Sequence, residues 1–146
     1  MSITQVLPML LYESRYGRLE LDESRQLVRY TRSATPFDTL DDAMTMFREV
    51  IAAGKEHGRR GCVLLSDVRL AVGRNDPEFE RVLQALRGEL FGAYPKRATL
   101  VRTVVGKLQI QRLNHEAQTT VEVFDDEAAA LGYLLSPRGA ATGHAR

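Results

Sequence analysis

The sequence predicts an α/β fold in which a mixed, mainly parallel sheet carries antiparallel strands at its N-terminal side. Two patterns predict this class. Short extended stretches separated by turn-like residues come first, and apolar runs then alternate with amphipathic stretches of helical period. A chain of 146 residues, 44% of them hydrophobic and 27% charged, suits one domain with a full core. We expect the element order βββ-αβ-αβ-αβ-α.

Three short strands are expected at the N-terminus, separated by turn-like Tyr16-Gly17 and by the polar run that follows Asp22. In the third strand, Val28 and Tyr30 alternate with polar neighbours, as in a strand with one buried face. The three strands are Leu10–Ser14, Arg18–Asp22 and Leu27–Arg32. We expect them to form antiparallel hairpins.

The pattern then changes to a helical period. After Pro36, either Asp38 or Thr39 can cap a helix that ends near Gly58. Its apolar face comprises Leu40, Ala43, Phe47, Val50 and Ile51. The apolar run Cys62–Leu65 follows and predicts a strand that is buried on both faces.

A second helix begins at Asp76-Pro77-Glu78, which combines a carboxylate cap, a proline at the first helical position and an acid in the first turn. Its buried side comprises Phe79, Val82, Leu83, Leu86 and Leu90. Met46 and Tyr94 fall outside the predicted faces, and exposure of either would indicate a contact surface.

The C-terminal part repeats the alternation of strand and helix. We expect a strand at Ala98–Val101, a helix after Thr103 that buries Leu108 and Leu113, and a strand at Val121–Phe124. Asp125 or Asp126 then opens a last helix through Ala128, Leu131 and Leu135. Residues 1–136 should form one domain, and residues 137–146 a disordered tail.

Composition excludes several classes of protein. A net charge of +1 gives no general attraction to nucleic acid, and no apolar run is long enough to span a membrane. A single cysteine, Cys62, forms no internal disulfide and suits the cytosol. The three histidines lack the spacing of a zinc site, so we expect no metal and no cofactor.

Charged residues gather where two predicted neighbouring strands end. Asp67, Arg69, Arg74, Asn75 and Asp76 follow one strand, and Arg102, Thr103 and Lys107 follow the next. With two helix N-termini at the same edge, these groups could receive a phosphate or an acidic side chain of a partner. The alternative is purely structural: Asp76 caps a helix, Asp67 pairs with a nearby arginine and the arginines are solvated.

Two stretches join a strand to a capped helix: VLLSDVRLAVGRNDPEFE and VEVFDDEAAALGYLL. They resemble the central and closing strand–helix units of the SpoIIAA-like, or STAS, fold. Its relatives include sulfate-transporter and anti-sigma-factor-antagonist domains and the lipid-binding CRAL-TRIO group. The resemblance covers roughly Arg18 to Leu135 and implies the same fold and a partner-binding role.

The chain departs from the anti-sigma-antagonist pattern at one point. A phosphorylatable serine or threonine lies there at the start of the helix after the central strand, whereas this chain has Gly73-Arg74-Asn75-Asp76-Pro77. Ser66 lies inside the end of the strand, where a kinase reaches it poorly. Asp76 would resemble a permanently charged substitute, and the phosphorylation switch is therefore in doubt.

We therefore expect a non-catalytic regulatory or scaffold domain that binds a protein partner through the segment from Asp67 to Phe79. A carrier or sensor of a small anionic or amphiphilic ligand is the alternative. An enzyme comes third, because Asp67 is the only candidate base at the strand ends. A homodimer is also possible. Ile110 either forms a contact face together with Gln111, or a slight rotation of its helix buries it in the core.

Overall fold

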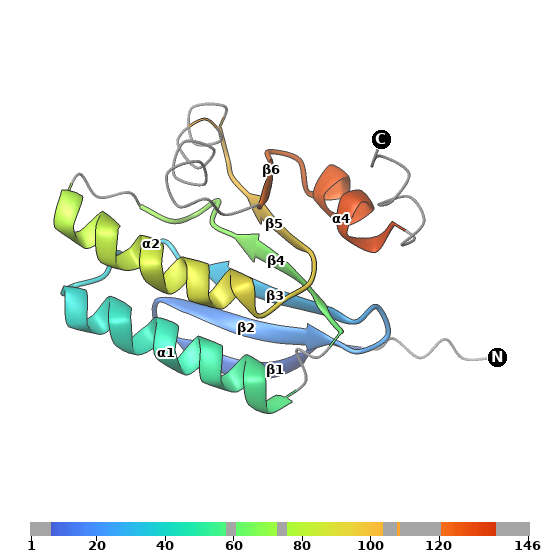
Figure 1. Ribbon diagram of the computed structural model, residues 1–146, viewed down its shortest axis with the longest axis horizontal. Helices are drawn as coiled ribbons and strands as arrows, with labels where there is room; N and C mark the ends of the chain where they lie inside the picture. The colour runs from blue at the N-terminus through green and yellow to red at the C-terminus, as the bar shows by residue number, and fades with distance from the viewer. Residues whose placement is uncertain (1–6, 58–60, 73–75, 104–107, 109–120, 137–146) are drawn as a thin grey trace.

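The computed structural model describes residues 7–57, 61–72, 76–103, 108 and 121–136 and contains a six-stranded mixed sheet (Figure 1). The strands lie side by side in chain order. The first three pair antiparallel, and the third to the sixth pair parallel. Their bounds are β1 Met9–Ser14, β2 Gly17–Asp22, β3 Leu27–Arg32, β4 Val63–Asp67, β5 Arg97–Leu100 and β6 Glu122–Phe124. The expected mixed α/β fold is confirmed.

The turn between β1 and β2 requires a glycine. A Cβ atom built on Gly17 would lie 2.7 Å from the carbonyl oxygen of Thr31, because β3 runs directly beside this position. Every other L-amino acid has a Cβ atom, so β2 can begin here only with a glycine unless the backbone of β3 shifts.

Two helices cover one face of the sheet. α1 (Leu40–His57) and α2 (Pro77–Gly92) lie side by side along it (Figure 1). Thr39, rather than Asp38, caps α1, since its hydroxyl accepts a hydrogen bond from the N–H of Asp42 at 3.1 Å. The core beneath them includes Leu19, Val28, Tyr30, Phe47, Val50, Leu64 and Leu83. Burial of such side chains contributes roughly 1.5–3 kcal/mol each.

Two side chains outside the predicted apolar faces are buried in this core. Met46 and Tyr94 are both almost inaccessible to solvent, so neither forms the exposed contact surface that the sequence left open. Tyr94 lies just beyond α2 and reaches α1, where its hydroxyl comes within 2.5 Å of where a Cβ on Gly54 would be. The C-terminal ends of α1 and α2 therefore pack closely against each other through Tyr94 and Gly54.

A third helix, α4 (Glu127–Leu135), packs on the opposite face over β4, β5 and β6 (Figure 1). Asp126 caps it, since its carboxylate accepts a hydrogen bond from the N–H of Ala129 at 2.9 Å. The buried residues of α4 are Ala130 and Leu134. The helix is apolar nearly all round, so apolar residues also lie on its outer side: Ala128 and Leu135 are exposed, and Leu131 is half-buried.

The helix expected between β5 and β6 lies outside the described residues except for Leu108, which is helical and 61% exposed. The prediction that Leu108 faces the core is therefore wrong. Ile110, Gln111 and the expected tail at 137–146 also fall outside the described residues. Of the helices that are described, none has the length and apolar character that crossing a membrane requires.

Candidate functional site

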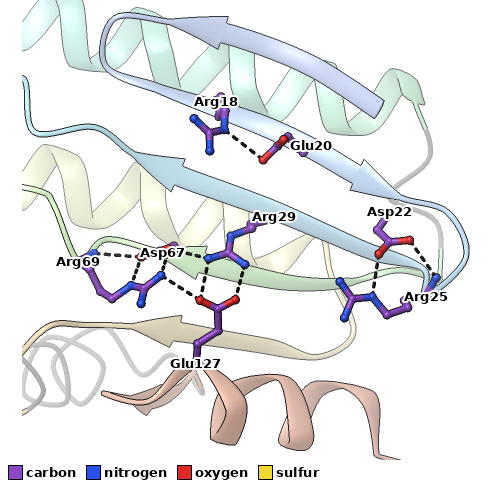
Figure 2. Close-up of polar contacts among 8 residues, drawn as sticks. All are labelled: Arg18, Glu20, Asp22, Arg25, Arg29, Asp67, Arg69 and Glu127. Carbon is purple, nitrogen blue, oxygen red and sulfur yellow. Dashed lines mark hydrogen bonds and ion pairs between the residues drawn. The ribbon is translucent and has the colours of Figure 1, made fainter. Parts of the chain in front are cut away.

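The clearest polar assembly is a closed ring of four ion-paired side chains on the face that carries α4 (Figure 2). We call Arg29, Asp67, Arg69 and Glu127 the ring. Each arginine contacts both acids: Arg29 reaches Asp67 at 2.7 Å and Glu127 at 3.0 Å, and Arg69 reaches them at 2.8 and 3.0 Å. The ring ties β3, β4, the loop after β4 and the start of α4 together.

Strand pairing explains how Arg29 and Asp67 meet. Arg29 of β3 lies opposite Leu65 of β4, and Asp67 follows two residues later on the same face. Glu127 lies near the C-terminal end of the chain. It reaches the same place because α4 begins directly after β6, at the carboxyl edge of the parallel strands. Arg69 is local to Asp67, and its backbone N–H also donates to the Asp67 carboxylate at 3.2 Å.

The Asp67 carboxylate is the buried member of the ring, with 7% of its side chain exposed against 37% for Glu127. Burial alone would raise the pKa of Asp67. Hydrogen bonds donated by Arg69 and Arg29 outweigh burial and hold that pKa below its ordinary value. At neutral pH the carboxylate is therefore ionised and fully engaged.

The charged form of Glu127, the more exposed acid of the ring, is also stabilised by the two arginines. Hydrogen bonds from Arg29, together with the positive charges of Arg29 and Arg69, outweigh the opposing effect of burial and lower the pKa of Glu127. Arg29 loses solvation in the fold, yet its contacts with Glu127 and Asp67 raise its pKa overall. Two cations and two anions thus remain charged together, and the ring is neutral as a unit.

Five of the predicted site residues lie within the described part of the chain. Asp67 and Arg69 come together in the ring, whereas Asp76 accepts a hydrogen bond from the N–H of Phe79 at 3.3 Å and caps α2. Arg102 and Thr103 are exposed just beyond β5, next to β4 in the sheet. Arg74, Asn75 and Lys107 lie outside the described residues. Sequence reasoning missed Arg29 and Glu127.

The loop after β4 exposes apolar side chains. Leu70 is 56% and Val72 is 54% exposed, although the strand before this loop is buried. The loop leaves the sheet through a turn in which the N–H of Ala71 donates to the carbonyl of Val68 at 3.1 Å. The N–H of Val68 in turn donates to Leu100 of β5 at 3.0 Å, which fixes the base of the loop.

No protein-family model matches the chain, and comparisons with curated proteins and with solved structures found no match either. Among the described residues, no three His, Cys, Asp or Glu side chains gather where they could hold a metal ion.

Proposed function

We propose that this chain is a non-catalytic regulatory or scaffold domain that binds a protein partner through the loop after β4 and the adjoining α2. The observation that carries the proposal is the exposure of Leu70 and Val72 in one short loop. Large apolar side chains that are grouped on a surface are characteristic of protein contacts. A partner that covered them would remove their apolar area from water.

The ring supports this role by fixing the base from which the loop starts. Asp67 accepts hydrogen bonds from both the backbone and the side chain of Arg69, so the chain direction at Val68 is defined before the apolar residues begin. A loop whose base is fixed in advance loses less conformational entropy on binding.

The chemistry of Asp67 favours binding over catalysis. A general base works best with a pKa near the operating pH. The pKa of Asp67 lies below that of an ordinary aspartate, and its two oxygens accept hydrogen bonds from two guanidinium groups. Protonation of this carboxylate would weaken its ion pairs with Arg29 and Arg69.

The resemblance to the SpoIIAA-like fold is part of the same proposal. The described α2 starts with the cap Asp76 and with Pro77, so no hydroxyl stands at the helix start where the family's phosphorylation site lies. Binding would then be independent of phosphorylation. We place the domain in the cytosol, acting alone or as a homodimer.

Affinity capture with matched variants tests the proposal. The wild-type chain, Leu70→Glu/Val72→Glu and Leu10→Glu would each serve as bait, and retained proteins would be quantified. Leu10 is the control, since it is 52% exposed but lies on β1, at the far edge of the sheet from the loop. We expect one partner to be retained by wild type and Leu10→Glu and lost from the loop variant. Direct titration with the purified partner should give the same order of affinities, and equal retention by all three baits would exclude this surface.

A further inference from the structure

Two guanidinium groups converge on the Glu127 carboxylate from different elements. Arg29 of β3 holds it with two bonds, from Nη1 to Oε2 at 3.0 Å and from Nη2 to Oε1 at 3.3 Å. Arg69, from the loop after β4, adds a third, from Nη2 to Oε1 at 3.0 Å. Paired arginine forks of this kind match the geometry of carboxylate and phosphate groups.

The two acids of the ring are not equivalent. Asp67 bonds to both arginines (Figure 2) and is only 7% exposed, so it orients them from the buried side of the ring. Glu127 lies on the solvent side and belongs to a separate helix, and more than a third of its side chain is exposed. The outer position of the ring is thus the one that an external group could reach without unfolding the sheet.

We propose that Arg29 and Arg69 form an oxyanion clamp for a carboxylate or phosphate group, which Glu127 occupies in this structure as an internal ligand. An external oxyanion binds by displacing the Glu127 side chain and takes over the same three donors. Asp67 stays in place and keeps the two forks aligned. The positive end of α4, which begins at Glu127, adds to the attraction.

Nearby acids limit the affinity. Asp125 and Asp126 are exposed beside the clamp, although the Asp126 carboxylate is engaged in capping α4. Competition from Glu127 weakens binding further, since any external group must replace an ion pair that is already formed. Removal of the Glu127 charge should therefore expose the intrinsic affinity of the clamp.

The test compares wild type, Glu127→Gln and Arg69→Gln/Glu127→Gln by nuclear magnetic resonance. Inorganic phosphate and acetate are titrated separately at constant ionic strength, with sodium chloride as the control, while the arginine side-chain N–H signals are followed. We expect Glu127→Gln to bind at least about tenfold more tightly than wild type, equivalent to about 1.4 kcal/mol. The double variant should lose that gain.

The phosphate and acetate arms identify the preferred oxyanion, and a gain with either supports the clamp. Equal shifts in all three proteins, or shifts of Glu127→Gln that sodium chloride reproduces, would show that the ring only fastens α4. If Glu127→Gln does not fold, wild type is titrated to high phosphate: shifts confined to Arg29 and Arg69 support the clamp, and dispersed shifts overturn it. The variants at Leu70 and Val72 test the partner-binding loop separately, because neither residue belongs to the ring, so failure of one proposal is distinguishable from failure of the other.

Discussion

Asp67 shows how a nearly buried carboxylate remains ionised at the end of a strand. Water is largely excluded, and the solvation it would have supplied is replaced by guanidinium donors on two sides. Glu127 carries the same charge in the same ring but keeps contact with water. The two acids should therefore differ in their contribution to stability, although each contacts both arginines.

Asp67→Asn should destabilise the fold by about 3 kcal/mol, because it leaves Arg29 and Arg69 facing a neutral group at the buried side of the ring. Glu127→Gln should cost only about 0–1 kcal/mol, since solvent screens this partly exposed pair. Urea unfolding of both variants measures the difference. Equal losses would show that burial does not distinguish the two acids.

The ring also shows which part of the site the sequence could predict. Asp67 and Arg69 are two positions apart, and pairing of this aspartate with a nearby arginine was an available interpretation. Arg29 lies 38 positions before Asp67, and Glu127 lies 58 positions after Arg69. Their approach depends on the register of β3 against β4 and on which face of the sheet α4 covers, and the sequence patterns determine neither.

At the scale of elements, helix starts were more predictable than helix faces. Asp76-Pro77 starts α2, and Asp126 starts α4, because a cap is a local hydrogen bond that neighbouring residues specify. The buried side of a helix is specified only where polar residues mark the opposite side. In α4 apolar residues surround the axis, so the sheet decides that Ala130 and Leu134 point inward.

The junction of α1 and α2 provides a matched test of packing. Gly54→Ala should destabilise by about 1–3 kcal/mol, because its Cβ would lie 2.5 Å from the buried hydroxyl of Tyr94. Gly88→Ala in α2 is the control: its Cβ would meet no atom within 4 Å, and better helix propensity should stabilise by up to about 1 kcal/mol. Thermal unfolding reports both, and a change of the same sign would refute close packing at Gly54.

Acid should destabilise the whole molecule through its depressed carboxyl groups. The pKa values of Asp67 and Glu127 are lower in the folded chain than their ordinary values of 3.8 and 4.5, so the unfolded chain binds more protons in this range. The free energy of unfolding should stay level from neutral pH to about pH 5 and decline below about pH 4. Urea midpoints at several pH values measure this decline, and Asp67→Asn should show a shallower one. A level profile in wild type through pH 3 would contradict it.

The overall architecture followed from the order of sequence patterns. Three short stretches separated by turn-like residues before the first helix predicted β1, β2 and β3, and the apolar runs after it predicted parallel strands. The register between strands and the assignment of helices to opposite faces were not predictable in this way. Both depend on long-range packing, which composition and periodicity do not encode.

β4 contributes side chains to the hydrophobic cores on both faces of the sheet, and this determines how the molecule unfolds. Leu64 points into the core under α1 and α2, whereas its neighbour Leu65 points into the core under α4. If the core on one face unfolded, the core on the other face would lose β4 as well. Unfolding should therefore be a single cooperative transition. The methyl signals of Leu64 and Leu65 should therefore disappear at the same temperature, although the two side chains lie on opposite sides of the sheet.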